Sequence, residues 1–508
     1  MTAGMLERSR APGERLLPAT MALMALLGLA LLLRSLVLVA TAAGLQVDEA
    51  QYWDWSRHLQ WGYWSKPPGI AAVIAASTTI FGDGLLGVKL LSMALWPLAA
   101  GVLAALAWDM AGRGQTGAQA GLWTAALLLG TPAAGILGMA ATTDAPLLLM
   151  WALCMALTWR ALQTPAGTSP LPWWALAGLA LGLGLLSKYT MAAITASWAL
   201  LLLKHWRRHG LGMVMAGALA LAVFAPNIFW NASNGWPTLG HTAEITVAAQ
   251  TPASGRALAV LEFILGQALL LGPVGLVTAL VAWRARRAGA AGTAPGSVDA
   301  GRFALMFALP LMAVALAQSV HSRANINWTV PALLGLCLCL GLYIAPRLGR
   351  RAWWISTALA FALPAGASLM GALPSVQQGA MRPGPHLDLW ARMRGWQPVL
   401  QQFEAGLQAH PGLPVAATSR ELVAHARYVW RALDRPVKAW PGSGKPRHHY
   451  EQFEALWAPG QRAPERILLL TNAPLSDHYK KQYPHWQRLD TAQWGKLNLE
   501  LWLASEQP

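Results

Sequence analysis

Long apolar blocks alternate with short polar connections through the first three quarters of the chain. Each block is close to the roughly 20 residues that cross a bilayer core as a helix. The pattern therefore predicts a mostly α, polytopic membrane protein with about 11 transmembrane helices. The predicted spans are residues 16–42, 85–109, 117–139, 144–162, 171–187, 189–203, 211–230, 257–283, 302–320, 328–345 and 351–373.

The basic residues between these blocks predict the orientation of the chain. If the N-terminus is cytoplasmic, the clusters 204–208, 284–302 and 347–351 all fall on the cytoplasmic side, as the positive-inside rule requires. A single long helix over 171–203 would invert every later cluster. We therefore expect the chain to re-enter the membrane at Lys188, which places this lysine at the outer face.

The first apolar block raises a separate question, because it ends in Ala40-Thr41-Ala42, which resembles a signal-peptidase site. The block is longer than the apolar region of a secretory signal and contains Arg34, so we expect it to be retained as a span. A charge in the middle of a span needs a partner, and Arg34 is expected to face the bundle interior in an ion pair.

The composition of the chain changes near residue 381, where charged residues become frequent. Short β-rich runs alternate with helical stretches such as 420–433, which predicts a small extracytoplasmic α/β domain over 382–508 after a transmembrane domain over 1–381. The β-rich runs are 413–417, 437–440, 467–471 and 499–503.

Composition excludes several classes of protein. Hydrophobic residues make up 55% of the chain and charged residues 12%, against about 25% charged in soluble domains. The net charge of +16 lies mostly in short loops, so a nucleic-acid partner is not expected. The three cysteines lie inside apolar spans without a CxxC motif, which indicates neither a structural zinc nor a disulfide framework.

Candidate chemistry is concentrated directly after the first span, in 47–58 and 61–69, which are rich in acids, bases and aromatic residues. The spacing suits a helix lying along the membrane interface. Such a stretch can be only an aromatic belt with incidental charges. The adjacent carboxylates Asp48 and Glu49 favour a function, because ionisable groups at membrane depth are costly and usually line a polar cavity.

The order of the motifs resembles glycosyltransferase family 39. Asp48-Glu49-Ala50 followed by Tyr52-Trp53, and then Lys66-Pro67-Pro68-Gly69, is similar to the first outer loop of this family, which includes protein O-mannosyltransferases and lipid A aminoarabinose transferases. The resemblance spans nearly the whole chain. Further matching motifs are Thr143-Asp144-Ala145-Pro146, residues 184–189, 226–231, 235–238 and 327–332, and, in the tail, 440–442 and 447–451.

This resemblance implies a GT-C membrane fold and an inner-membrane enzyme that transfers a sugar from a polyprenyl-phosphate donor to an extracytoplasmic lipid, glycan or protein. It also implies that Asp48 is the catalytic base of an inverting transfer, in which a carboxylate takes the proton of the acceptor hydroxyl. Cations must stabilise the charge on the leaving phosphate. Lys66 is the first candidate, with Lys188 and Arg323 as further contacts.

Other candidate residues carry two interpretations each. Asp144 either orients the acceptor or Lys66, or caps its helix. Glu49 is either a second acceptor-binding acid or the partner of Arg57 or Lys66. A histidine in the fourth outer loop either contacts the donor or a metal, or is simply solvated. The expected substrate-pocket residues are Tyr52, Trp53, Tyr63, Pro67 and His241.

The sequence departs from the aminoarabinose transferases at Ser65, where those enzymes carry an acid linked to metal binding. The sequence therefore does not support a bound metal, although a divalent metal stays open as an alternative, and it indicates no other cofactor. Two other classes of protein remain as alternatives. A polytopic transporter of a lipid or small solute typically has inverted repeats and a midplane site, which the sequence does not show. An envelope scaffold would leave the cluster of Asp48, Glu49 and Lys66 unexplained.

Overall fold

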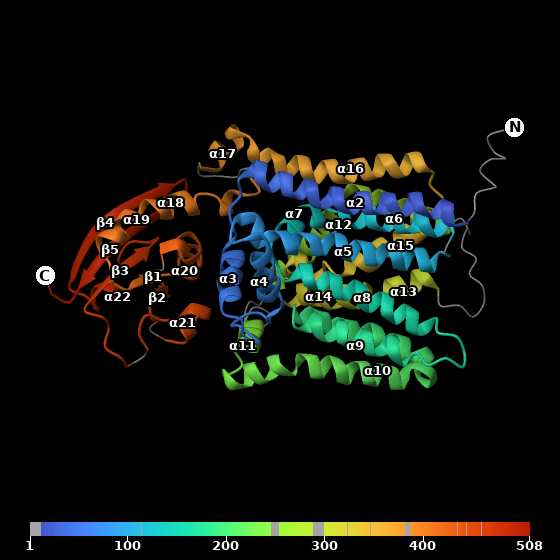
Figure 1. Ribbon diagram of the computed structural model, residues 1–508, viewed down its shortest axis with the longest axis horizontal. Coiled ribbons are helices and arrows are strands. Elements are labelled where there is room, and N and C mark those ends of the chain that lie inside the picture. Colours follow the sequence, from blue (N-terminus) through green and yellow to red (C-terminus); the bar gives the residue numbers. More distant parts are fainter. Residues whose placement is uncertain are drawn as a thin grey trace.

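The computed structural model describes residues 12–507 except 113, 245–252, 288–298, 323, 346, 382–386, 434, 443 and 459. The candidate phosphate contact Arg323 lies outside these described residues. The N-terminal helix runs along an elongated helix bundle, and it begins at the end opposite to the C-terminal domain (Figure 1). We call the end that meets the C-terminal domain the head end.

The bundle consists of apolar helices, seven of which are long enough to cross a membrane among the described residues. Each of the predicted spans corresponds to a helical segment. The helices are α2 (Pro12–Thr41), α5 (Leu85–Met110), α6 (Gln115–Leu129), α7 (Pro132–Ile136), α8 (Asp144–Leu162), α9 (Leu171–Leu185), α10 (Ala193–Ser233), α12 (Arg256–Arg287), α13 (Ala300–Met306), α14 (Leu309–His321), α15 (Ala332–Ile344) and α16 (Arg350–Leu369).

The predicted span 117–139 is bent by 63° between Gln115–Leu129 and Pro132–Met139. The bend follows from Pro132, which has no N–H to continue the helix but suits a new helical start. Thr131 caps that start by accepting a hydrogen bond from the Ala134 N–H at 3.1 Å. A second break occurs in α12 at Gly272, whose φ of 76° is non-helical.

The helical stretch α10 folds back on itself. It is made of an apolar segment Tyr189–Leu201 and a membrane-length segment Leu203–Ser233. The Tyr189 hydroxyl donates a hydrogen bond to Asn227 Oδ1 at 2.8 Å, whereas a straight helix would separate these residues by about 57 Å. Two helical segments therefore follow Lys188 where two spans are predicted: Leu203–Ser233 is long enough to cross a membrane, and Tyr189–Leu201 is a shorter apolar helix.

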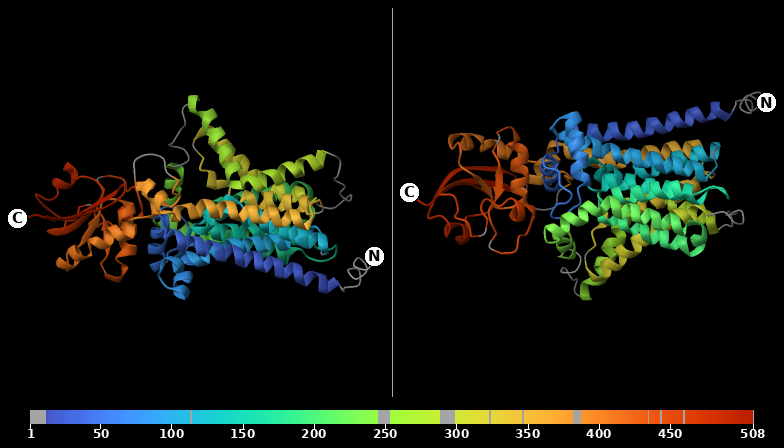
Figure 2. Two further views of the ribbon diagram at one scale, coloured as in Figure 1. Left: turned by 90° about the horizontal axis from the view of Figure 1, so that it is seen from above. Right: turned by 60° about the horizontal axis from the view of Figure 1, so that its bottom comes forward.

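Short helices cover the head end of the bundle. Helices α3 (Val47–Arg57) and α4 (Gly69–Phe81) lie across it, between the bundle and the C-terminal domain (Figures 1 and 2). Helix α11 (Pro237–Ala243) and helix α17 (Pro374–Met381) lie at the same end. The segments that the sequence assigns to one side of the membrane thus meet at one end of the bundle.

The C-terminal domain contains a five-stranded sheet in the order β2-β1-β3-β5-β4. Strand β1 pairs in parallel with β2 and β3, and β5 pairs antiparallel with β3 and β4. The strands are β1 (Val415–Ala417), β2 (Val437–Ala439), β3 (Arg466–Thr471), β4 (His485–Trp494) and β5 (Leu497–Ser505). The helices are α18 (Trp396–Gln402), α19 (Glu404–Ala409), α20 (Arg420–Val429), α21 (His449–Phe453) and α22 (Asp477–Lys480).

The four predicted strands correspond to β1, β2, β3 and β5, but β4 was not predicted. Most of its side chains are exposed, including those of His485 and Trp494. It is an edge strand, so its sequence lacks the alternation of apolar and polar residues that marks a half-buried strand.

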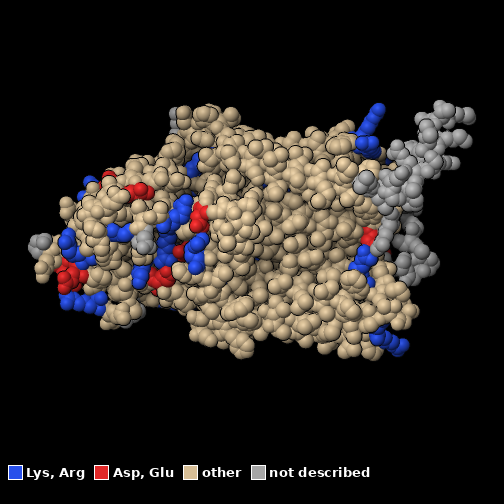
Figure 3. All heavy atoms as spheres, viewed as in Figure 1, with Lys and Arg blue, Asp and Glu red and all other residues tan. Residues whose placement is uncertain are grey.

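Charged side chains are distributed as a membrane-spanning bundle requires. Figure 3 shows a broad surface without charged side chains over the bundle, with charges on the C-terminal domain and at the opposite end. Arg34 in α2 is buried, as expected, but its partner differs from the prediction. Its Nη1 lies 3.5 Å from the Met93 carbonyl and its guanidinium lies over the Trp96 ring, and no ion pair to Arg34 is present among the described residues.

Candidate active site

Helix α3 begins with two acids that have different environments. The side chain of Glu49 is completely buried (0% exposed) and completes a capping box at the helix start. Its Oε2 accepts hydrogen bonds from the Gln46 N–H at 2.8 Å and from Lys89 Nζ at 2.7 Å, and its Oε1 accepts one from the Ala141 N–H at 2.7 Å. Glu49 therefore joins α3 to α5 and to the segment before α8.

The buried partner of Glu49 is Lys89 in the first turn of α5, where we had expected Arg57 or Lys66. Lys89 is 2% exposed. Both carboxylate oxygens of Glu49 are engaged within the protein, so neither is free to meet an acceptor. Arg57 instead pairs with Asp83 at 2.9 Å.

The side chain of Asp48 is half-exposed (49%) and borders a cavity of about 740 Å³. Its Oδ1 accepts a hydrogen bond from Arg420 Nη1 at 2.8 Å, and the same Nη1 donates to Gln51 Oε1 at 2.9 Å. Arg420 is the first residue of α20 in the C-terminal domain. A carboxylate from the bundle and a guanidinium from the last fifth of the chain thus meet at this site.

Lys66 is held close to Lys188 by the glycine of its motif. The Gly69 N–H donates to the Leu186 carbonyl at 2.7 Å. A Cβ on Gly69 would lie 2.8 Å from the same carbonyl oxygen and 2.8 Å from the Ser187 side chain, so only glycine permits this contact. The segment before α4 and the segment before α10 are therefore fixed side by side.

Lys188 forms an ion pair with Asp144, which begins α8, at 2.7 Å between Nζ and Oδ1. Asp144 does not cap its helix through its own side chain, since it lies inside the first turn and the cap position is Thr143. Lys66 forms no ion pair among the described residues. Burial lowers the pKa of the Lys66 ammonium, and the neighbouring Lys188 lowers it further, while Asp48 and Asp144 act in the opposite direction.

Tyr52 and His241 adjoin the same charges. Burial raises the pKa of the Tyr52 phenol, and the charge of Asp48 adds to the effect. Burial lowers the pKa of the His241 imidazole, and the charge of Lys66 adds to it. We call Asp48, Lys66, Asp144, Lys188 and Arg420 the charged cluster.

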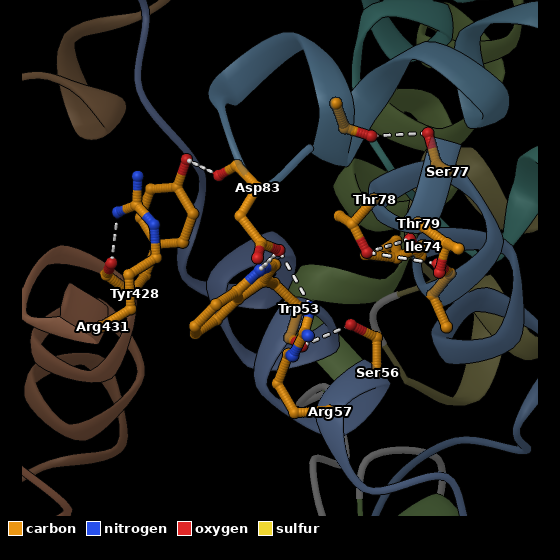
Figure 4. A network of polar contacts seen from close by, with 12 residues as sticks. Trp53, Ser56, Arg57, Ile74, Ser77, Thr78, Thr79, Asp83, Tyr428 and Arg431 are labelled. Carbon is orange, nitrogen blue, oxygen red and sulfur yellow. Dashed lines mark hydrogen bonds and ion pairs between the residues drawn. The ribbon is translucent and has the colours of Figure 1, made fainter. Parts of the chain in front are cut away.

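Trp53 and Tyr63 are buried and pack within the protein. The Trp53 indole donates to Asp83 Oδ1 at 3.0 Å and contacts the Tyr428 ring edge-on, as Figure 4 shows. Tyr63 stacks on Trp55 with ring centroids 4.3 Å apart and is fully buried. Pro67 is likewise buried. These three side chains thus pack behind the charged cluster, and their contact with a substrate stays a prediction.

The other motifs noted in the sequence assemble around the loop that precedes Lys66. The Asn227 amide donates to the Trp61 carbonyl at 2.6 Å, and the Thr238 hydroxyl donates to the Tyr63 carbonyl at 2.9 Å. Gly62 allows the Trp230 ring to approach, because a Cβ there would lie 2.3 Å from that ring. Motifs about 170 residues apart in sequence thus support one loop.

A second contact between α3 and α20 lies beyond Arg420. Arg427 donates from Nη1 to Asp54 Oδ2 at 2.9 Å and pairs through Nη2 with Glu454 at 2.5 Å. Burial raises the pKa of Asp54 although Arg427 opposes this effect. The two arginines are seven residues apart, about two helical turns, so α20 is clasped to α3 at two points.

Comparisons with known proteins agree with this architecture. The model of the family described as dolichyl-phosphate-mannose-protein mannosyltransferase matches residues 65–230. The lipid A galacturonosyltransferase RgtD of Rhizobium johnstonii is 28% identical over 427 residues, which cover 83% of this chain and 85% of the relative.

Two crystal structures of ArnT from Cupriavidus metallidurans have a similar fold. The apo structure superposes with a TM-score of 0.63 at 15% identity, over 94% of this chain and 98% of that one. The structure bound to undecaprenyl phosphate superposes with a TM-score of 0.63 at 16% identity, over 94% and 97%. The predicted GT-C-like membrane fold is confirmed.

Proposed function

We propose that this chain, a membrane glycosyltransferase of the GT-C fold that uses a polyprenyl-phosphate-linked sugar, transfers the sugar to a lipid-anchored saccharide of the lipid A class. RgtD supports this choice of acceptor, since it is named a lipid A galacturonosyltransferase and matches most of the chain. The structure of ArnT with undecaprenyl phosphate supports the choice of donor lipid.

The observation that carries the donor assignment is the pair of lysines in the charged cluster. Lys188 is neutralised by Asp144, whereas Lys66 has no carboxylate partner among the described residues. A partly buried ammonium without a counter-charge is costly, and a phosphate supplies the missing negative charge. We assign Lys66 to the donor phosphate, with Lys188 beside it.

Asp48 fits the role of base because it is the acid of the cluster with an exposed carboxylate. The acceptor oxygen forms a bond to the anomeric carbon while the bond from that carbon to the phosphate oxygen breaks. The acceptor proton passes to Asp48, and the electron pair leaves with the polyprenyl phosphate. Lys66 and Lys188 stabilise the charge that develops on this phosphate.

The remaining candidates receive positioning roles. Asp144 fixes Lys188, and Glu49 fixes the start of α3 through its buried pair with Lys89. Tyr52 and His241 adjoin the charged cluster, where a phenol and a neutral imidazole can hydrogen-bond to a sugar or a phosphate. Arg420 holds Asp48 in the absence of substrate and is available to the donor phosphate once that anion enters.

We infer that the chain lies in the inner membrane with its head end facing the periplasm. Helices α13 and α16 begin at the opposite end of the bundle (Figure 1), and their first turns carry Arg302 and Arg350, which follows the positive-inside pattern. The N-terminus is then cytoplasmic, and the C-terminal domain is periplasmic. A membrane-anchored donor reaches the charged cluster from the outer leaflet.

The test is mass spectrometry of lipid A from a deletion strain and its parent. We expect the deletion to remove one sugar from lipid A, and expect the wild-type chain, but not Asp48→Asn, to restore it. Loss of a sugar from envelope glycoproteins with unchanged lipid A would move the acceptor to protein. Unchanged glycolipids and glycoproteins would overturn the proposed function.

A further inference from the structure

A cavity of about 740 Å³ lies between the bundle and the C-terminal domain, with Asp48 in its wall. Its other walls come from α17, from the segment 388–396, from the start of α20 and from the β4–β5 turn. Lys66 does not line this cavity. The proposed base thus faces a hollow on one side and the proposed phosphate site on the other, as a transfer between two substrates requires.

The lining of the cavity suits a saccharide. Two indole rings, Trp396 and Trp494, lie beside the polar side chains of Glu421 and Asn472. Sugars present apolar C–H faces and a rim of hydroxyls, so stacking aromatics with nearby hydrogen-bonding groups match them. Trp494 remains 37% exposed although it packs against Gly395, where a Cβ would lie 2.5 Å from its ring.

A buried histidine in the wall has an unused hydrogen-bonding atom. His425 is 2% exposed and stacks on Trp396 with centroids 4.0 Å apart. Its Nε2 has no hydrogen-bond partner among the described residues. Burial and the charge of Arg420 lower the pKa of His425 to about 3, so the ring is neutral. Buried polar atoms are normally satisfied, and this unsatisfied one belongs to a residue of the cavity wall.

The charges around the cavity favour an anionic group. Asp388 pairs with Arg394 at 2.8 Å, and Asp48 pairs with Arg420. Within the described chain no ion pair involves the two remaining basic residues of the lining, Arg392 and Lys496, and the remaining acid is Glu421. The three acids and three bases of the lining cancel, and Arg420, which pairs with Asp48 from just outside the lining, brings the formal charge around the cavity to +1.

The rim of the cavity is apolar where it meets the bundle. Leu373, Met381, Leu387 and Leu389 are exposed next to the cavity-lining residues of α17 and the segment that follows it. The Arg394 guanidinium also bonds to the Thr41 carbonyl at the end of α2. The cavity therefore lies at the level where the bundle emerges from the membrane, next to a surface suited to acyl chains.

We infer that this cavity is the acceptor subsite, which binds the phosphorylated saccharide head of a membrane glycolipid with its acyl chains along the apolar rim. Arg392 and Lys496 bind the anionic group, Trp396 and Trp494 contact the sugar rings, and a hydroxyl reaches Asp48. The inference rests on the proposed function for the identity of the bond that is made, but the binding itself is measurable without turnover.

The test measures binding of two lipids to the purified full-length protein in detergent by native mass spectrometry. The probes are phosphorylated lipid A and undecaprenyl phosphate. We expect Arg392→Glu together with Lys496→Glu to weaken lipid A binding about tenfold or more, and to leave undecaprenyl phosphate binding unchanged. Lys438→Glu is the matched control, since Lys438 is an exposed lysine of β2 outside the cavity.

The outcomes separate the two proposals. Equal loss of both lipids would assign the cavity to the donor, and unchanged binding of both would overturn the subsite. Deacylated lipid A and inorganic phosphate serve as further probes. If phosphate binds as tightly as lipid A, the cavity recognises only the anionic group and not the saccharide, which would overturn the inference. If lipid A binds here but the deletion strain loses no sugar, the proposed function fails while the subsite stands. Thermal unfolding checks that each variant is folded.

Discussion

Arg420 Nη1 lies 2.8 Å from Asp48 Oδ1 and joins residues that are 372 positions apart in the chain. The arginine belongs to the C-terminal domain and the aspartate to the first helix after the first span. The contact unites the soluble domain with the proposed chemistry, because a base that is held by a cation must be released before it takes a proton. We propose that a donor phosphate that competes for Arg420 supplies that release.

Asp48→Asn is expected to reduce turnover about 100-fold or more, because an amide cannot take the acceptor proton. Asparagine keeps an oxygen that accepts from Arg420, so folding and donor binding should be retained. Sugar transfer by the purified protein is the measurement. Asp54→Asn is the matched control, since it alters the second contact with α20 without touching the proposed base. Full activity of Asp48→Asn would remove the base assignment.

Lys66→Ala is expected to weaken binding of undecaprenyl phosphate about tenfold or more, since a charge-assisted contact to phosphate is lost. Binding should also weaken as the pH rises through the lowered pKa of Lys66, because the neutral amine no longer attracts the anion. Lys445→Ala is the control, as that lysine is exposed in the C-terminal domain. Unchanged affinity and pH dependence would place the phosphate elsewhere.

Lys89→Met is expected to destabilise the protein strongly, by about 3–5 kcal/mol, because it leaves the buried Glu49 carboxylate without its counter-charge. Adding Glu49→Gln should recover much of the loss, since an uncharged amide needs no cation. The thermal unfolding temperature in detergent reports both changes. A double variant less stable than Lys89→Met would contradict the pairing.

Gly69→Ala is expected to abolish most activity, because its Cβ would collide with the Leu186 carbonyl and move Lys66 away from Lys188. Gly84→Ala offers a control at the start of α5, where a Cβ meets no atom within 4 Å and φ is −70°. Transfer assays on both variants decide the question. Equal activities would show that the two lysines need not be fixed together.

Stability is expected to fall as the pH drops below about 6.5, the ordinary pKa of histidine. Burial lowers the pKa of His425 to about 3, so between these values the unfolded chain binds a proton that the folded chain does not. By linkage, the free energy of unfolding then decreases with falling pH. His425→Phe keeps the stack on Trp396 and should flatten this dependence, whereas His485→Phe, at an exposed position, should not. If the free energy of unfolding changes with pH in the same way in the wild type, His425→Phe and His485→Phe, the lowered pKa of His425 is contradicted.

Local patterns predicted much of the fold. The apolar blocks indicated the spans, and the distribution of basic residues indicated a reversal of the chain at Lys188. Trp174 of α9 accordingly contacts Trp198, which follows Lys188, with ring centroids 5.4 Å apart. The strand β4 escaped prediction because an exposed edge strand has no apolar alternation. The bend at Pro132 could have been anticipated from the proline within the predicted span.

The partners of the acids were harder to predict. The pairing of Lys89 with Glu49 could have been predicted from the sequence. A lysine at the start of a span needs an acidic partner, and Glu49 precedes that span at the same end of the bundle. Arg420 and Arg427 carried none, because their contacts depend on how the C-terminal domain packs against α3. Trp53 and Tyr63 were assigned to a pocket because aromatic residues suit both sugars and packing, and sequence alone does not separate these uses.

The two ion pairs between α3 and α20, Asp48–Arg420 and Asp54–Arg427, also determine when the charged cluster can form during biosynthesis. All bundle helices are made before residue 420, so the nascent protein can occupy the bilayer with every span inserted and still lack the arginine that reaches Asp48. The charged cluster is therefore complete only after residue 420 has been made and the C-terminal domain has folded onto α3.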